Sequence, residues 1–410
     1  MLPDPDPAPH DPTAAGHDPR PSADPGPGIV PDGGATAAGS VRRRRVRYSG
    51  THPRRFAEKY KERAPERYAD EVAKIVASGK TPAGTHRSIL VAEILETLEP
   101  RPGQTFVDCT LGYGGHAREI LARLGDDGQL VGFDCDPVEL PKTVERLRRD
   151  GWNEARFLPI RSNFAGLAAG LAGAGIPAVD GILADLGVSS MQLDDPGRGF
   201  TYKDDGPLDL RMNPQRGRPA SEWLSRVAPE ALAAALRDNA DEPMAGPLAE
   251  AIVASVRERP VTRTRDLARR LHDLYRERGW TRDKAEGDAR VRRVFQALRI
   301  EVNDEFGVLE ALLRQIPSCL KPGGRVAILT FHSGEDRRVK RAFLEGQRQG
   351  LYEVISDSVR RPGPEELRSN PRSAPAKLRW AVRSAQGAGG ADLEAGPLDR
   401  VPRRVPRHQP

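Results

Sequence analysis

The chain has 410 residues, of which 38% are hydrophobic and 30% charged, and its formal net charge at pH 7 is +6. This length suffices for roughly two domains with terminal extensions. The basic, arginine-rich balance suits partners that carry phosphate, although a solvated basic surface is the commoner cause of such a balance.

The three cysteines, Cys109, Cys135 and Cys319, are far apart and form no CxxC pair, so neither a disulfide framework nor a zinc site is supported. We expect no bound metal. No segment resembles a signal peptide, and no run is long enough to span a membrane. The simplest expectation is a protein of the reducing cytoplasm.

Residues 1–84 are predicted to form a disordered, charged extension. Residues 1–40 are rich in Pro, Gly, Ala and Asp and almost lack large apolar side chains, so they cannot offset the entropy of ordering. The run Arg42–Arg45 could bind RNA or phosphate, but a solvated tail is the simpler interpretation. Residues 384–410 turn again to Gly, Pro and Arg, which predicts a second disordered tail.

Folded structure is predicted from about residue 85, where a helix over 89–98 precedes the segment 106–117, FVDCTLGYGGHA. This segment begins as an apolar strand, breaks into glycines that include Gly114 and Gly115, and resumes as a helix. A strand, a glycine turn and a helix N-terminus are typical of a nucleotide-cofactor site, because glycines let the backbone approach the ligand.

The next predicted strand, 129–133, ends in Asp134, about 20 residues beyond the glycines. An acid at this spacing reaches the ribose hydroxyls of a cofactor, and we favour this role over that of a solvated aspartate. The two elements do not separate a nicotinamide cofactor from an adenosyl one. A third strand is predicted at 155–158, followed by Phe164, which could stack on a flat base, although a lone aromatic residue more often belongs to the core.

A continuously apolar fourth strand, 179–185, ends in Asp185 beside the expected cofactor pocket. Further strands are predicted at 325–330, 352–355 and 378–382. Strands that alternate with helices predict an α/β fold with a parallel, doubly wound sheet, formed by residues 85–192 and 294–383.

Between the two halves, residues 193–293 are predicted to form an all-helical insertion. Helical patterns cover 220–227, 229–238, 247–257 and 264–278, and in the last of these, leucines share one face while arginines cover the others. The insertion could hold the substrate, or it could only stabilise the sheet. A single long amphipathic helix is predicted over 294–320.

Taken together in order, the motifs closely resemble the RsmH (MraW) family of S-adenosylmethionine-dependent methyltransferases, over about residues 86–382. The motifs that carry the resemblance are DCTLGYGGH (108–116), DCDP (134–137), DLGVSSMQLD (185–194), RGFT (198–201), GPLDLRM (206–212), FQALRI (295–300) and FHS (331–333). The family methylates the exocyclic N4 of a cytidine in bacterial small-subunit (16S) ribosomal RNA. The resemblance therefore implies a Rossmann-like methyltransferase sheet with a helical insertion, S-adenosyl-L-methionine as cofactor, and the 30S particle or its RNA as partner.

Carried over by position, the resemblance implies cofactor contacts at Gly114, Gly115, His116, Asp134, Phe164, Asp185 and Gln192. The chain departs from the family pattern in two places. Gly334 stands where a leucine usually follows the FHS motif, and Arg292-Arg293-Val294 stands before Phe295 in place of the usual threonine. Both departures concern the RNA side more than the cofactor side.

Asp185 is the predicted catalytic residue. The cytosine amine is a poor nucleophile, so the protein has to align it with the methyl group and accept hydrogen bonds from it as positive charge develops. His332 could hold the substrate or its loop, or could be structural. A nicotinamide-dependent oxidoreductase and a non-catalytic RNA-binding protein are the alternatives, but the first lacks an acid/base pair for hydride chemistry and the second would not need carboxylates at adjacent strand ends.

Overall fold

The computed structural model describes residues 88–385, so the predicted extension over 1–84 and nearly all of the predicted tail over 384–410 lie outside the described residues. The described residues lie within one compact unit of the chain. They contain no helix that is both long and apolar enough to cross a membrane.

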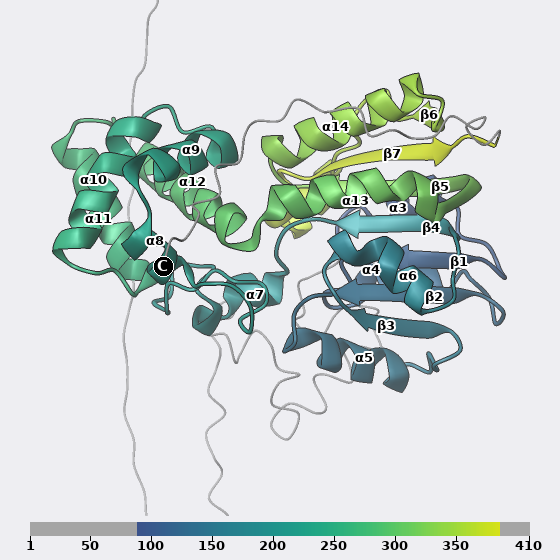
Figure 1. The fold of residues 1–410 in the computed structure, drawn as a ribbon. Helices are drawn as coiled ribbons and strands as arrows, with labels where there is room; N and C mark the ends of the chain where they lie inside the picture. The colour runs from purple at the N-terminus through teal and green to yellow at the C-terminus, as the bar shows by residue number, and fades with distance from the viewer. Residues whose placement is uncertain (1–87, 386–410) are drawn as a thin grey trace, which may run out of the picture. The chain divides into compact units, whose positions relative to one another are not determined.

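A seven-stranded sheet forms the centre of the fold, with the strand order β3-β2-β1-β4-β5-β7-β6 (Figure 1). The five strands β1 to β5 are mutually parallel, whereas β7 runs antiparallel to both β5 and β6. The strands are β1 (Thr105–Asp108), β2 (Gln129–Asp134), β3 (Phe157–Arg161), β4 (Val179–Asp185), β5 (Leu320–Thr330), β6 (Tyr352–Ile355) and β7 (Lys377–Arg383).

The predicted α/β class and Rossmann-like methyltransferase sheet are confirmed, with two differences of detail. The third strand covers 157–161 rather than 155–158, and the sheet is mixed rather than wholly parallel because β7 returns antiparallel beside β5. The strand order reverses at β1, which lies between β2 and β4. Ligands of open α/β sheets bind at the carboxyl ends of the strands near such a reversal.

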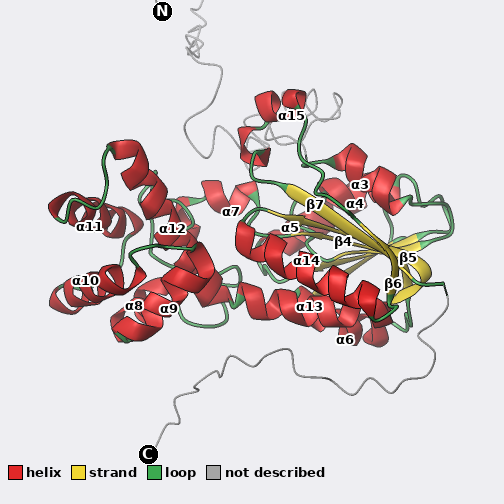
Figure 2. Ribbon diagram, turned by 90° about the horizontal axis from the view of Figure 1, so that it is seen from above, coloured by secondary structure: helices red, strands yellow, loops and turns green. Residues whose placement is uncertain are grey.

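Each face of the sheet has its own hydrophobic core, because successive strand residues point to opposite faces. Val107 packs with residues of α6, α13 and α14, whereas its neighbour Phe106 packs with residues of α3, α4 and α5. Figure 2 shows helices on both sides of the sheet. The helices concerned are α3 (Val91–Leu98), α4 (Gly115–Leu121), α5 (Glu139–Arg149), α6 (Leu167–Gly173), α13 (Glu305–Cys319) and α14 (Ser333–Arg348).

A group of helices between β4 and β5 has a separate hydrophobic core (Figures 1 and 2). It contains α7 (Ser190–Asp194), α8 (Ala220–Arg226), α9 (Pro229–Ala240), α10 (Ala245–Glu258), α11 (Thr264–Glu277) and α12 (Lys284–Asn303). The remaining short elements are η2 (Phe164–Gly166), η3 (Pro196–Arg198), α15 (Pro364–Ser369) and η4 (Pro371–Ser373). The boundary predicted at residue 293 falls inside α12.

The prediction of one helix over 294–320 is wrong. The chain leaves α12 at Asp304, whose φ of 49° lies in the left-handed region, and starts α13 at Glu305. Aspartate tolerates this conformation better than most residues because its short polar side chain can hydrogen-bond locally. The apolar period continues through the break, so periodicity alone does not reveal it.

Candidate active site

The glycine turn after β1 is tied to the end of β2. Gly112 and Gly114 have φ values of 48° and 82°, which favour glycine, and Gly114 caps the N-terminus of α4. The Gly112 N–H donates to Asp134 Oδ2 at 2.9 Å, and the Asp136 N–H donates to Asp134 Oδ1 at 2.8 Å. A Cβ atom added to Gly115 would lie 2.0 Å from Ser88 Oγ, so this hydroxyl would have to move to admit any other residue.

Asp134 retains capacity for a ligand. Each carboxylate oxygen accepts one backbone N–H, whereas an ionised oxygen can accept about two hydrogen bonds. Burial raises the pKa of Asp134 to about 6, against the effect of the two N–H groups, which lower it. The residue thus ends β2 as a partly buried acceptor, which suits the ribose role.

A cavity of about 1510 Å³ extends from the carboxyl ends of the strands to the helical insertion. Residues from widely separated parts of the chain line it, including Gly115, His116, Asp134, Phe164, Asp185 and Gln192. Gly114 is not among the lining residues, because it faces α5: a Cβ atom there would lie 3.0 Å from the Thr143 side chain. Six of the seven predicted cofactor residues therefore share one cavity.

Asp185 and His116 form the centre of this arrangement. His116 Nε2 lies 3.5 Å from Asp185 Oδ2, and the imidazole is only 7% exposed. Burial opposes its charged form, but the contact with Asp185 and the nearby Asp108 raise the pKa of His116 above its ordinary value.

Two buried atoms of this pair lack partners. Neither His116 Nε2 nor Asp185 Oδ1 has a hydrogen-bond partner among the described residues, although both are buried. An unmade buried hydrogen bond costs about 1–3 kcal/mol, so a polar ligand that completes these bonds would be favoured. A polar, cation-bearing cofactor fits this end of the cavity.

Asp185 is held in position by Thr110, two residues after the end of β1. Its backbone N–H donates to Thr110 Oγ1 at 2.6 Å, and the Thr110 N–H donates to Asp108 Oδ1 at 3.0 Å. Asp108 is 1% exposed, and burial raises its pKa to about 6. The hydrogen bonds from Asp108 through Thr110 fix the end of β4 without using the Asp185 carboxylate, whose Oδ2 contacts His116 and whose Oδ1 stays available to a ligand.

Gln192 joins two loops at the cavity wall. Its Oε1 accepts the Ser189 N–H at 2.9 Å, in a capping box that starts α7, and its Nε2 donates to Asp136 Oδ2 at 2.9 Å. Arg198 also binds Asp136 Oδ2, at 2.7 Å. Since both ends of the amide are engaged, the structure gives Gln192 a positioning role beside its predicted contact with the cofactor.

The position of Phe164 agrees in part with both roles considered from the sequence, stacking on a flat base and packing in the core. It begins η2, which Asn163 caps by accepting the Ala165 N–H at 3.1 Å. The ring is half-buried and packs against the core that contains Val107, yet it also lines the cavity. One side of the ring is therefore available for stacking.

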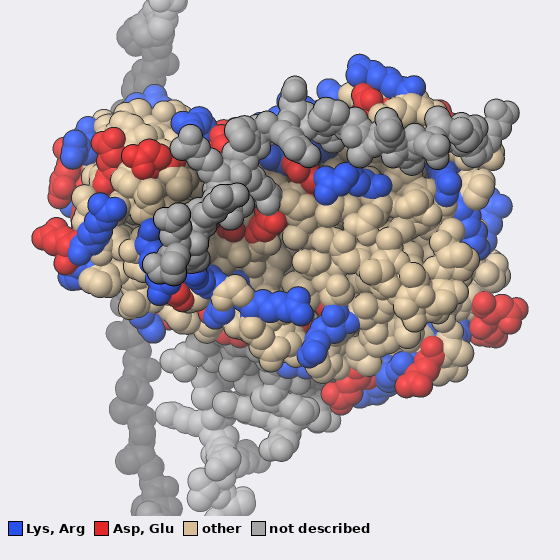
Figure 3. All heavy atoms as spheres, in the orientation of Figure 1, with Lys and Arg blue, Asp and Glu red and all other residues tan. Residues whose placement is uncertain are grey.

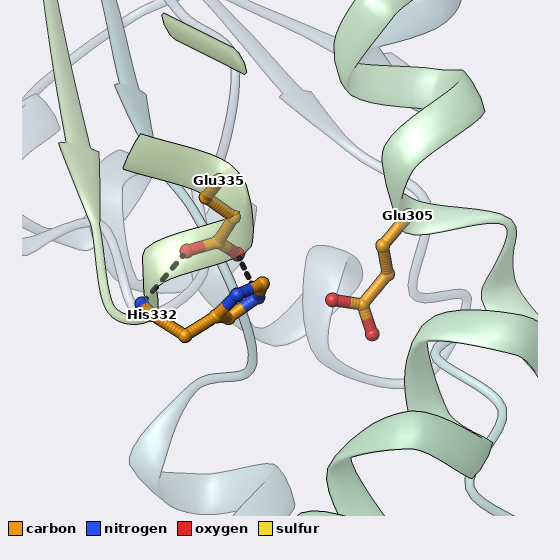
Figure 4. A group of neighbouring side chains, drawn as sticks. All are labelled: Glu305, His332 and Glu335. Atoms are coloured by element: carbon orange, nitrogen blue, oxygen red, sulfur yellow. Dashed lines mark hydrogen bonds and ion pairs between the residues drawn. The ribbon is translucent and has the colours of Figure 1, made fainter. Parts of the chain in front are cut away.

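A charged cluster that was not predicted from the sequence lines the other side of the cavity. Arg299 donates to both carboxylate oxygens of Glu305, from Nε at 2.7 Å and from Nη2 at 2.9 Å. His332 Nε2 lies 3.1 Å from Glu335 Oε1, and the Phe331 N–H donates to Glu335 Oε2 at 2.8 Å (Figure 4). Burial disfavours the charged form of Glu335, but His332, Phe331 and Arg299 lower its pKa overall.

This cluster has the composition of a metal site, although the sequence predicts none. Glu305, His332 and Glu335 each offer a ligand atom, and these atoms lie within 4.8 Å of one another (Figure 4). Both oxygens of Glu305 already bind Arg299, however, and its guanidinium supplies the positive charge that a metal ion would supply. The cluster therefore lines the cavity with its charges already balanced, without a metal ion. The FHS and FQALRI motifs contain His332 and Arg299, but Glu305 and Glu335 lie outside them. The pairing of Arg299 with Glu305 depends on the break at Asp304, which no motif signals.

Comparison with known proteins agrees with this geometry. A model of the MraW methylase family matches residues 83–384. Ribosomal RNA small subunit methyltransferase H 1 of Lachnoclostridium phytofermentans is 47% identical over 348 residues, which cover 84% of this chain and 94% of that protein. Ribosomal RNA small subunit methyltransferase H 2 of Alkaliphilus metalliredigens is 46% identical over 344 residues, which cover 84% and 98%.

Among solved structures, an rRNA methylase from Streptococcus thermophilus matches with a TM-score of 0.32 and 12% identity, over 72% of this chain and 93% of that one. The assignment rests on the family match and on the relatives, both of which cover nearly all of the described residues. The chain therefore belongs to the MraW methylase family, and it is an S-adenosyl-L-methionine-dependent methyltransferase.

Proposed function

We propose that the chain methylates the exocyclic N4 of a cytidine in bacterial small-subunit (16S) ribosomal RNA, and that it acts on the 30S particle in the cytoplasm. The observation that carries the proposal is the continuity of the cavity, from Asp134 at the end of β2 through Asp185 to the helical insertion. Its relatives are named as methyltransferases of small-subunit ribosomal RNA. A site of this length accommodates a nucleoside cofactor at one end and a target nucleoside at the other.

At the sheet end, the residues of the glycine turn and of β2 would hold the cofactor. Asp134 accepts from its ribose hydroxyls, Phe164 stacks beside its adenine, and His116 donates or accepts at the unpartnered Nε2. When bound, S-adenosyl-L-methionine supplies an electrophilic methyl carbon. No protein nucleophile is needed for this reaction.

Asp185 acts on the target amine. The N4 lone pair is delocalised into the cytosine ring. Positive charge builds on N4 as its bond to the methyl carbon forms and the bond from that carbon to sulfur breaks, and N4 then loses one proton to water. The Asp185 carboxylate, held by Thr110 through its own backbone N–H, accepts a hydrogen bond from N4 and stabilises this charge. The loop carbonyls after Asp185 can accept the second amine hydrogen.

The target base has to leave its stack to reach Asp185. β5 is the neighbour of β4, so the Phe331-His332 segment at the end of β5 lies beside Asp185 at the strand ends. Both residues line the cavity. We propose that they form the wall against which the flipped cytosine rests, with Glu335 holding His332 in position.

Two measurements test the proposal. Equilibrium binding of tritiated S-adenosyl-L-methionine and of NAD to the purified chain should show affinity for the first only. Small subunits from a bacterial strain without its own enzyme, and protein-free RNA extracted from them, should then be compared as methyl acceptors. Label in the particle RNA supports the proposal, whereas NAD binding or the absence of label in both acceptors would refute it.

A further inference from the structure

The opening of the cavity differs in charge from its interior. Carboxylates of Asp134, Asp185, Glu305 and Glu335 line the interior. The cavity is also lined by three exposed cations from the insertion side, Lys203, Arg216 and Arg292. We call these three residues the rim cations.

The rim cations come from different segments. Lys203 and Arg216 belong to the long loop between η3 and α8, and Arg292 belongs to α12. Because they line the cavity and are nevertheless exposed, they stand at its opening rather than in its interior. Their charges are therefore presented to whatever enters.

None of the rim cations forms an ion pair with a carboxylate of the described residues, although most of the arginines there do. Two acids that line this cavity are already paired with other arginines: Arg372 pairs with Asp194 at 2.6 Å and Arg265 with Asp204 at 3.8 Å. On the face in Figure 3, lysine and arginine groups are separated by uncharged surface and by acidic groups. Unpaired cations at an opening are available to bind phosphate, without first breaking an internal salt bridge.

An aromatic ring accompanies the charges. Tyr202 precedes Lys203, lines the same cavity and is half-buried. Its ring packs against Phe295 of α12, with 5.0 Å between ring centroids and a tilt of 44°. Phe295, which also lines the cavity, supports the ring from one side. A supported aromatic ring beside basic side chains is how proteins bind single-stranded nucleic acid, since bases stack on the ring and phosphates meet the charges.

We infer that Tyr202 and the rim cations form a binding surface for the single-stranded RNA that flanks the target nucleotide. A base next to the target stacks on Tyr202, and the phosphates on either side contact Lys203, Arg216 and Arg292. This inference rests on the proposed function and adds to it the residues that hold the RNA strand. It also gives Arg292 a use, at the position where the chain departs from the family pattern.

The first test removes the three charges together. Binding of K203A/R216A/R292A to protein-free small-subunit rRNA should be measured by filter retention at several salt concentrations. Each phosphate contact on a single strand contributes about 0.7 to the slope of log affinity against log salt, so the slope should fall by about two. At about 0.15 M salt the affinity should fall by about tenfold or more. Affinity for S-adenosyl-L-methionine should not change, which also shows that the variant is folded.

The matched control is Arg257→Ala. Arg257 lies on α10, is exposed, has no ion-pair partner among the described residues, and does not line the cavity. Its variant should bind RNA like the wild type. If the logarithm of RNA affinity fell in Arg257→Ala by one third of its fall in the triple variant, any surface arginine would have the same effect. That result would overturn the inference.

The second test separates stacking from charge. Tyr202→Phe keeps the ring and should retain normal RNA affinity, whereas Tyr202→Leu should lose about tenfold, because stacking of one base contributes about 1–3 kcal/mol. The salt slope should stay normal in both.

Several results would contradict the inference. They are an unchanged salt slope in the triple variant, equal behaviour of the phenylalanine and leucine variants, or a defect seen with 30S particles but absent with protein-free RNA. The last result would mean that the surface contacts a ribosomal protein. If the wild-type chain itself neither bound nor methylated the RNA, the proposed function would fail instead, so the two failures are distinguishable.

Discussion

Around the ends of β1, β2 and β4, backbone amides and a threonine hydroxyl fix the positions of Asp134 and Asp185, and His116 also contacts Asp185. Glu305 and Glu335, at the starts of α13 and α14, are held mainly by arginine and histidine side chains. Asp134 accepts N–H groups from the Gly112 turn and from Asp136. Glu305 instead accepts both of its bonds from Arg299. This difference determines which carboxylate charges are left uncompensated and can therefore interact with a ligand.

The pKa values follow the same division. Burial raises the pKa of Asp134 to about 6, because neutral amides compensate its charge only partly. The pKa of Glu335 is lowered in spite of burial, because its neighbours His332 and Arg299 stabilise the carboxylate. Asp134 and Asp185 are thus open to a cation and to hydroxyl groups, whereas the charges of Glu305 and Glu335 are already compensated by their neighbours.

The largest expected effect is on the chemical step. Asp185→Asn keeps the shape of the side chain and removes its charge, so turnover should fall by about 10²–10³, the size seen when one transition-state partner is lost. Affinity for S-adenosyl-L-methionine should fall much less. Asp180→Asn is the control, because Asp180 lies on the same strand but binds Thr105 and Lys321 at its other end. Recovery of normal turnover at saturating cofactor would leave Asp185 with a binding role only.

The second effect concerns cofactor affinity. Asp134→Ala removes an acceptor from the ribose and should weaken S-adenosyl-L-methionine binding by about 1.5–3 kcal/mol, measured by calorimetry. Turnover at saturating cofactor should change less. Unchanged affinity would remove Asp134 from the cofactor site and would leave it as the residue that only ties the glycine turn.

The pH dependence sharpens the comparison. Above about pH 6 the Asp134 carboxylate is ionised and accepts hydrogen bonds, and below that value protonation removes the acceptor. Cofactor affinity should therefore fall as the pH falls through about 6, by at most about tenfold per pH unit for one proton. In Asp134→Asn this decline should flatten. A decline of the same steepness in the variant would assign it to another group, with Asp108 the first candidate because its pKa is also raised to about 6.

The smallest expected effect is on the free energy of unfolding, at the contact between the helical insertion and α14. Asp241 accepts from Arg337 at 3.1 Å and from Ser333 at 2.9 Å, but both charged side chains are about half exposed. Asp241→Asn, which tolerates the left-handed backbone there, should lower the free energy of unfolding by less than about 1 kcal/mol in urea titration. A larger loss would mean that this pair, rather than the hydrophobic cores, holds the two parts together.

The sheet end of the site could be predicted from sequence because its geometry is local. The role of Asp134 could be predicted from a strand, a glycine turn and the distance in sequence between the glycines and the acid. The role of Asp185 could be predicted from an apolar run that ends in an acid. Arg299 and Glu305 are six residues apart, and they meet only because the chain turns at Asp304, inside what the apolar period presents as one helix. Gln192 shows the same limit, since its bond to Asp136 spans 56 positions.

The most direct test of the account is the chemical identity of the methylated nucleoside. Small subunits from a strain without its own enzyme should be incubated with the full-length chain and labelled S-adenosyl-L-methionine, and the digested RNA should be analysed by mass spectrometry against nucleoside standards. The account predicts label in N4-methylcytidine, at one position, with a rate that falls about 10²–10³-fold in Asp185→Asn. Label on a ring carbon, on a ribose, or on another base would contradict it.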